Sequence, residues 1–68
     1  MKEITKGYLS YRFKFYLEEG KVEIFDNDYN LLKKININFD SNLEKILQKN
    51  NYEMVELFDK ILEKENLR

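Results

Sequence analysis

The sequence predicts an α+β fold: a three-stranded antiparallel β-meander followed by one or two C-terminal α-helices packed on one face of the sheet. Three observations predict it. Apolar and polar side chains alternate with a period of two up to about residue 40. The period then changes to about 3.6, as expected for helices. Two clusters of turn-forming residues divide the first part into strands, and 68 residues suffice for one small domain spanning 1–68.

The first predicted strand covers residues 8–17. Apolar side chains occupy its odd-numbered positions, from Leu9 to Leu17. The residues between them are mainly polar or charged, such as Arg12 and Lys14. This alternation is typical of a strand with one buried face, and its aromatic enrichment suits a pleated surface.

The first turn is predicted around Gly20, which can adopt a positive φ. A two-residue turn places Leu17 opposite Val22. The same register places Phe15 opposite Ile24, so both pairs lie on one face. Changing the connection by one residue would send the apolar sets to opposite faces. We therefore predict a connection of two or four residues.

The third predicted strand covers residues 31–39 and carries its apolar side chains on the same face. The favoured register places Val22 opposite Ile35. It also places Glu23 opposite Lys34, an opposite-charge pair worth roughly a few tenths of a kcal/mol. The result is an antiparallel meander with one apolar face.

Residues 26–30, between the second and third strands, are rich in Asp and Asn and predict a turn. They also match the opening of a calcium-binding loop. However, Leu31 stands where that loop needs Gly, and Ile37 where it needs a bidentate Glu. We interpret the segment as a hairpin turn and predict no metal site.

Helical spacing predicts the C-terminal part of the chain. Ser41 and Glu44 match a capping box at a helix start. A polar stretch in the middle predicts two helices, 42–49 and 52–65. The alternative, one helix over 42–65, would be about 36 Å long. It would overhang a nine-residue strand of about 30 Å.

The predicted core combines one face of the meander with the apolar positions of the helices. Large apolar side chains must fill it, because a chain of this length buries only about 60% of its unfolded surface. Its members are Leu9, Tyr11, Phe13, Phe15, Leu17, Val22, Ile24, Ile35, Ile37, Leu43, Leu47, Phe58 and Ile61.

Composition argues against enzymatic function. The chain has no Cys and no His, which removes the best thiol nucleophile, the usual general base and the preferred zinc ligands. We predict no catalytic residues, no metal and no cofactor.

There is no signal-peptide pattern and no apolar run of the roughly 18 residues that a membrane span needs. The prediction is a cytoplasmic protein without a membrane partner.

Two surfaces are candidate contact sites. The first is the sheet face turned away from the helices, where aromatic and basic side chains interleave. Such a face can be an ordinary solvated surface with a small apolar cluster, or it can contact a protein or stack on single-stranded nucleic acid. Its predicted members are Tyr8, Arg12, Lys14, Tyr16, Phe25, Leu32 and Lys34. The second is the apolar side of the last helix, a candidate partner contact or dimer seam formed by Met54, Leu57, Phe58 and Ile61.

By elimination, we expect a small non-enzymatic protein-binding regulator or inhibitor that covers a surface of another protein. Frequent Asn and Lys, with no Ala or Pro, are typical of an AT-rich genome and suggest a phage or mobile element. A nucleic-acid-binding module using the outer sheet face is the second hypothesis. It ranks lower because 12 basic and 13 acidic residues leave no surplus for phosphate contacts. A structural homodimer is the third.

Overall fold

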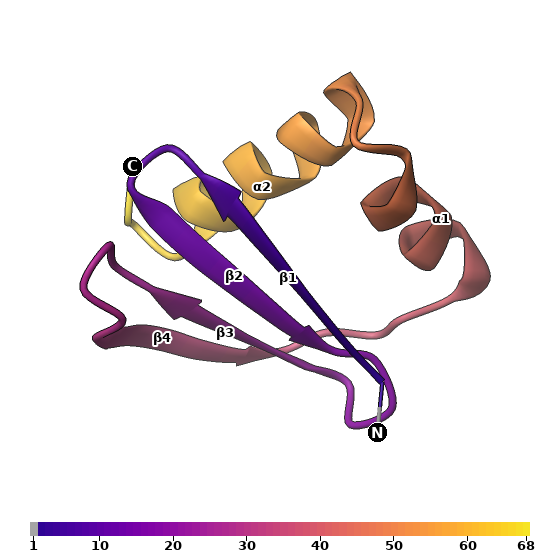
Figure 1. The fold of residues 1–68 in the computed structure, drawn as a ribbon, viewed down its shortest axis with the longest axis horizontal. Helices are drawn as coiled ribbons and strands as arrows, with labels where there is room; N and C mark the ends of the chain where they lie inside the picture. Colours follow the sequence, from indigo (N-terminus) through magenta and orange to yellow (C-terminus); the bar gives the residue numbers. More distant parts are fainter. Residues whose placement is uncertain (1) are drawn as a thin grey trace.

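A computed structural model describes residues 2–68 and shows an α+β fold in which two helices lie on one side of a four-stranded antiparallel sheet (Figure 1). Neighbouring strands in the sheet are also neighbours in the chain. The strands are β1 (Glu3–Tyr8), β2 (Tyr11–Tyr16), β3 (Lys21–Phe25) and β4 (Leu31–Asn36). The helices are α1 (Ser41–Lys49) and α2 (Tyr52–Lys64). The predicted fold class is confirmed, but the sheet has one strand more than predicted.

The additional strand is β1, which pairs antiparallel with β2 through a tight turn. Leu9 and Ser10 form this turn, and Tyr8 lies opposite Tyr11. Leu9 has a φ of 56° and is 61% exposed. The prediction that Leu9 belongs to the core is therefore wrong. The predicted strand over 8–17 is therefore split. The alternation that begins at Leu9 crosses the turn without a change of period, which is why it concealed the turn.

Residues 17–20 connect β2 to β3, so the four-residue alternative of the predicted turn is the correct one. Gly20 adopts a φ of 68° and donates its N–H to the carbonyl of Tyr16 at 3.0 Å. This register places Phe15 opposite Val22, two residues away from the register of the two-residue alternative. A shift of two preserves the side-chain parity, so the apolar sets still share one face.

The predicted register between β3 and β4 is confirmed over its central part. Val22 lies opposite Ile35, and Glu23 lies opposite Lys34. The strand is shorter than predicted, because β4 ends at Asn36 and the chain then runs to α1.

A β-bulge interrupts the same ladder near the second turn. Ile24 lies opposite Lys33, whereas Phe25 lies opposite Leu31. Leu32 is therefore an additional residue in β4. Bulges of this kind bend a strand and are frequent at sheet edges.

The break between the helices is confirmed. Asn50 is left-handed, with a φ of 55°, and ends α1. Asn51 is extended, and its side chain accepts the N–H of Glu53 at 3.0 Å, which begins α2. Asn tolerates the left-handed region and is a favourable N-cap, so the two adjacent asparagines suit these two positions. Lys6 of β1 donates to Oδ1 of Asn50 at 2.8 Å.

The predicted N-cap of the first helix is wrong by one residue. Asp40, not Ser41, is the cap, and its Oδ1 accepts the N–H of Leu43 at 2.8 Å. Ser41 is the first helical residue. An aspartate at the cap supplies the same hydrogen bond as serine and adds a negative charge beside the positive end of the helix.

The core lies between β2, β3 and the helices. Three aromatic rings dominate it. The ring of Phe58 lies 4.6 Å from that of Phe13 and 5.8 Å from that of Phe15, and the three are nearly parallel. The buried residues are Phe13, Phe15, Val22, Ile24, Leu47, Phe58, Ile61 and Leu62.

Most of this core was predicted, with two kinds of error. Tyr11, Leu17, Ile35, Ile37 and Leu43 are only partly buried. Leu62 is buried but was not predicted. It accepts the N–H of Leu67 through its carbonyl at 2.9 Å, in the C-terminal turn after α2, and Leu67 folds back against the core.

We expect Phe58→Ala to destabilise the fold by about 3–5 kcal/mol, because it removes the ring that stacks on two others and leaves a cavity. This is comparable with the whole stability of a small domain, about 5 kcal/mol. Leu9→Ala is the control, with an expected change within about 0.5 kcal/mol. Urea unfolding measures both. Equal stability of the two variants would contradict the central place of the stack.

Asp40→Ala should cost about 1 kcal/mol, because it removes the acceptor for the N–H of Leu43 at the start of α1. Ser41→Ala should be within about 0.5 kcal/mol of the parent, since Ser41 is not the cap. Thermal unfolding of the two variants compares them directly. A larger loss of stability from Ser41→Ala than from Asp40→Ala would contradict Asp40 as the cap and support the capping box predicted from the sequence.

Candidate functional site

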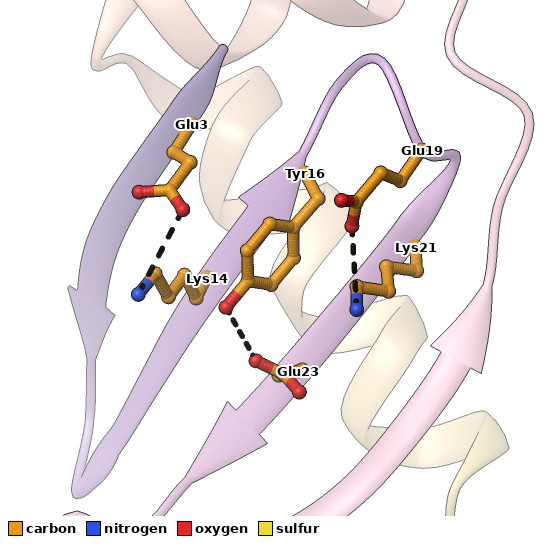
Figure 2. Close-up of polar contacts among 6 residues, drawn as sticks. All are labelled: Glu3, Lys14, Tyr16, Glu19, Lys21 and Glu23. Atoms are coloured by element: carbon orange, nitrogen blue, oxygen red, sulfur yellow. Dashed lines mark hydrogen bonds and ion pairs between the residues drawn. The ribbon is translucent and has the colours of Figure 1, made fainter. Parts of the chain in front are cut away.

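The face of the sheet turned away from the helices, called the outer face below, brings together most of the predicted sheet-face residues. Residues directly opposite one another in antiparallel strands share a face. Arg12 lies opposite Phe25, and Glu23 lies between Lys14 and Lys34. Figure 2 shows part of this face, with the helices behind the sheet.

Tyr8 does not belong to the outer face. Its hydroxyl donates to Oδ1 of Asp59 at 2.8 Å, and its ring lies 5.6 Å from that of Phe58. Both partners are on α2, so Tyr8 lies on the helix side. The prediction placed Tyr8 in one strand with Arg12, but the turn at Leu9 and Ser10 puts it in β1, opposite Tyr11.

The predicted contact residues of the last helix lie mostly against the sheet. Phe58 and Ile61 are buried in the core, and Met54 and Leu57 are partly buried against it. Phe58 and Ile61 are therefore not presented to a partner in this fold. Their predicted role as a contact or dimer seam has no support from their position.

Tyr16 is the centre of a polar network on the outer face (Figure 2). Its hydroxyl donates to Oε1 of Glu23, across the β2–β3 ladder, at 2.6 Å. This hydrogen bond, followed by desolvation, raises the pKa of Tyr16 above its ordinary value. Tyr16 thus has its polar group engaged within the protein.

The lysines next to Tyr16 each have a carboxylate neighbour (Figure 2). Nζ of Lys14 lies 3.9 Å from Glu3 and 5.4 Å from the centre of the Tyr16 ring. Nζ of Lys21 lies 3.3 Å from Glu19 and 4.6 Å from the same ring. The Tyr16 hydroxyl, followed by the Glu3 carboxylate, raises the pKa of Lys14. The positive charge of this half of the face is therefore largely compensated by the protein itself.

The other half of the outer face carries a partly exposed cluster that we call the hairpin patch. Its members are Arg12, Phe25, Tyr29 and Leu31, together with the adjoining bulge residue Leu32. The Arg12 guanidinium lies 5.7 Å from the centre of the Tyr29 ring, and the Phe25 ring lies 6.4 Å from it. Tyr29 is 66% exposed and Leu31 is 52% exposed.

The side chain of Arg12 lies close to Gly7 of β1 and to Tyr29 in the turn between β3 and β4. Its Nη1 lies so close to Gly7 that a Cβ there would approach it to 2.8 Å. Its Nε is buried and has no hydrogen-bond partner among the described residues. The guanidinium of Arg12 is therefore buried at Nε and also contacts the Tyr29 ring through a cation-π interaction.

Asp26 organises the turn that presents Tyr29. Its Oδ1 accepts the backbone N–H groups of Asp28 at 2.8 Å and of Asn30 at 3.0 Å. Its Oδ2 accepts from the side chain of Asn30 at 3.2 Å. The turn predicted at residues 26–30 is thus an Asp-centred hairpin turn, with Tyr29 at a φ of 62°. The N–H of Asn30, ahead of its side chain, lowers the pKa of Asp26.

Sequence reasoning missed Tyr29 and Leu31 as members of the patch. The sequence places Tyr29 in a polar turn and Leu31 in the regular part of a strand. The available signal was one aromatic residue in an otherwise polar turn, followed by two leucines. The bulge at Leu32, which sets Leu31 opposite Phe25, has no such signal.

Comparison with family models, with curated proteins and with solved structures found no match for this chain. Over residues 2–68, no helix is long and apolar enough to cross a membrane. No pocket opens in the described part of the chain, so the candidate site is a surface.

Asp26→Asn should lower stability at neutral pH and remove a pH dependence in the acid range. The folded pKa of Asp26 lies below its ordinary 3.8, so its contribution is present above that pH and is lost as pH falls through the lower folded value. Urea midpoints between roughly pH 2 and 6 measure the effect. The stability gap between parent and variant should shrink toward low pH, whereas a constant gap contradicts the carboxylate's role. Asp28→Asn is the control.

Proposed function

We propose that the protein is a non-enzymatic binding protein, a regulator or inhibitor that covers a surface of another protein with its hairpin patch. One observation supports this most: an arginine, two aromatic residues and Leu31 gather on the outer face, outside the buried core, with the exposed bulge residue Leu32 next to them in the chain. Arg and Tyr are enriched among the residues that dominate binding energy at protein interfaces.

The exposure of the patch supports the same proposal. Tyr29, Leu31 and Leu32 are exposed at one end of the sheet, although the core is complete without them. Scattered apolar residues on a surface are ordinary, but a contiguous cluster is typical of a contact site. Burying these side chains under a partner would remove apolar area from water.

The fixed position of Arg12 favours a contact of this kind. Gly7 leaves room for the side chain to lie across β1, and Tyr29 covers the guanidinium. A side chain that is already ordered loses little conformational entropy on binding. Arg12 and Tyr29 therefore form a preorganised pair in the centre of the patch.

The nucleic-acid alternative receives less support. Single-strand binding depends on a positively charged groove lined by aromatic side chains. On the outer face, Lys14 and Lys21 have carboxylate neighbours, and the hydroxyl of Tyr16 is bound to Glu23. Origin from a phage or mobile element rests on composition alone and stays a prediction.

The test compares two exposed tyrosines. Tyr29 is 66% exposed in the patch, and Tyr52 is 70% exposed on α2. Tyr29→Ser should weaken binding to proteins captured by the parent by about tenfold or more, as expected for a hot-spot residue. Tyr52→Ser should leave it unchanged. Capture from a host lysate with quantitative mass spectrometry, followed by dissociation constants for the captured proteins, measures both.

Two results would count against the proposal. One is retention of the same proteins, with the same affinity, by Tyr29→Ser. The other is oligonucleotide binding at low salt that weakens steeply with added salt, since that dependence marks phosphate contacts. Equal thermal stability of the two variants ensures that the comparison concerns the surface.

A further inference from the structure

We propose that the partner adds an extended strand to the free edge of β4 and places a carboxylate opposite Lys34. This inference rests on the protein-binding function proposed above and names the chemistry of the partner. β4 is the last strand of the sheet, so one of its edges has no neighbour among the described residues. Addition of a strand to such an edge is a recurrent mode of peptide recognition.

The hydrogen-bond phase of the β3–β4 ladder shows which backbone groups point outward. The N–H of Ile37 donates to the carbonyl of Gly20 at 2.9 Å. Bonded and non-bonded pairs alternate in antiparallel ladders. Ile35 therefore directs its backbone groups toward β3, whereas Lys34 and Asn36 direct theirs to the free edge. Two outward residues at this spacing are what an incoming strand pairs with.

The helices leave β4 largely open. The four residues from 31 to 34 are all exposed, and only Ile35 packs against the core. In β2 and β3, by contrast, alternate side chains are buried. An incoming strand would meet no covering element along these four residues.

Charge identifies the kind of strand that fits. Across the outer face, Lys14, Glu23 and Lys34 lie in one row and alternate in sign. The next position of the row, beyond Lys34, would continue the alternation with a carboxylate. Lys33 adds a second positive charge at the same edge. Within residues 2–68, neither Lys33 nor Lys34 takes part in an ion pair.

A second copy of this chain fits the edge less well. Lysines on edge strands are a common device against pairing of like sheets. An antiparallel pairing of β4 with its own copy, centred on the outward-facing Lys34, would set the Lys34 side chains of the two chains directly opposite each other. Direct opposition of like charges destabilises a ladder. The favoured occupant is therefore an acidic extended segment of another protein.

The hairpin patch extends the same surface and adds an apolar requirement. Leu31 and Leu32 precede Lys34 in β4, and Tyr29 lies beyond them. A strand whose carboxylate faces Lys34 would pass these side chains about three residues further along. The partner segment thus combines an acidic residue with an apolar one.

The test uses the full chain and two synthetic peptides of alternating Thr and Val with either Glu or Lys at the centre. Nuclear magnetic resonance titration should show the Glu peptide shifting the amides of Lys34 and Asn36 and slowing their exchange. Lys34→Glu should weaken the Glu peptide by about fivefold or more and strengthen the Lys peptide, because the charge pairing is reversed. Lys60→Glu, on the exposed side of α2, is the matched control.

Three results would overturn the inference. The first is the absence of shifts at Lys34 and Asn36. The second is equal binding of the two peptides by the parent chain. The third is protection of the same amides without peptide, with a mass that rises with concentration, because that result assigns the edge to a second copy.

The outcomes also separate this inference from the proposed function. If Tyr29→Ser abolishes capture of a partner while Lys34→Glu does not, the binding function holds and strand addition fails. If neither substitution affects capture, the hairpin patch is not the contact site. The peptide titration needs no identified partner, so it decides on the edge by itself.

Discussion

The stacking of Phe58 on Phe13 and Phe15 is the interaction on which the rest of the structure depends. It fixes α2 over β2 and so determines which face of the sheet is buried. Because strand side chains alternate, inward Phe13 and Phe15 oblige Arg12 and Lys14 to face outward. The outer face is therefore a direct consequence of the core. Aromatic residues suit this task in a short chain, since each ring buries a large area.

The core uses the four strands unequally. β2 and β3 carry all the buried residues of the sheet, and β1 is joined to α2 and the interhelical break through Tyr8 and Lys6. β4 contributes little beyond the partly buried Ile35. Its exposed leucines and lysines are thus free of a packing constraint. In β2, by contrast, Lys14 and Tyr16 are engaged in contacts within the sheet, and Arg12 contacts the ring of Tyr29.

Local patterns predicted most of the fold but not the edge strand β1. The shared face of Phe15 and Val22 follows from the alternation of side chains along the strands alone. The adjacent residues Asn50 and Asn51 indicate the break between the helices. β1 could not be found in this way. Leu9 continues the odd-numbered apolar series although it lies in a turn, so only pairing with β2 distinguishes the two strands. The candidate surface was found through Arg12 and Phe25, but Tyr29 joins it through the conformation of a turn.

The bulge at Leu32 connects the hairpin patch with the edge of β4. It sets Leu31 opposite Phe25, and it interrupts the ladder beside the regular stretch that contains Lys34. Bulges and lysines are both means by which sheets avoid joining their own copies. The exposed leucines have the opposite effect, because they favour burial under a partner. Specificity is a difference between affinities, and it is increased by features that penalise the wrong occupant. The lysines of this edge disfavour a second copy of the chain, and its exposed leucines favour burial under a partner. Together the two features favour an acidic strand of another protein.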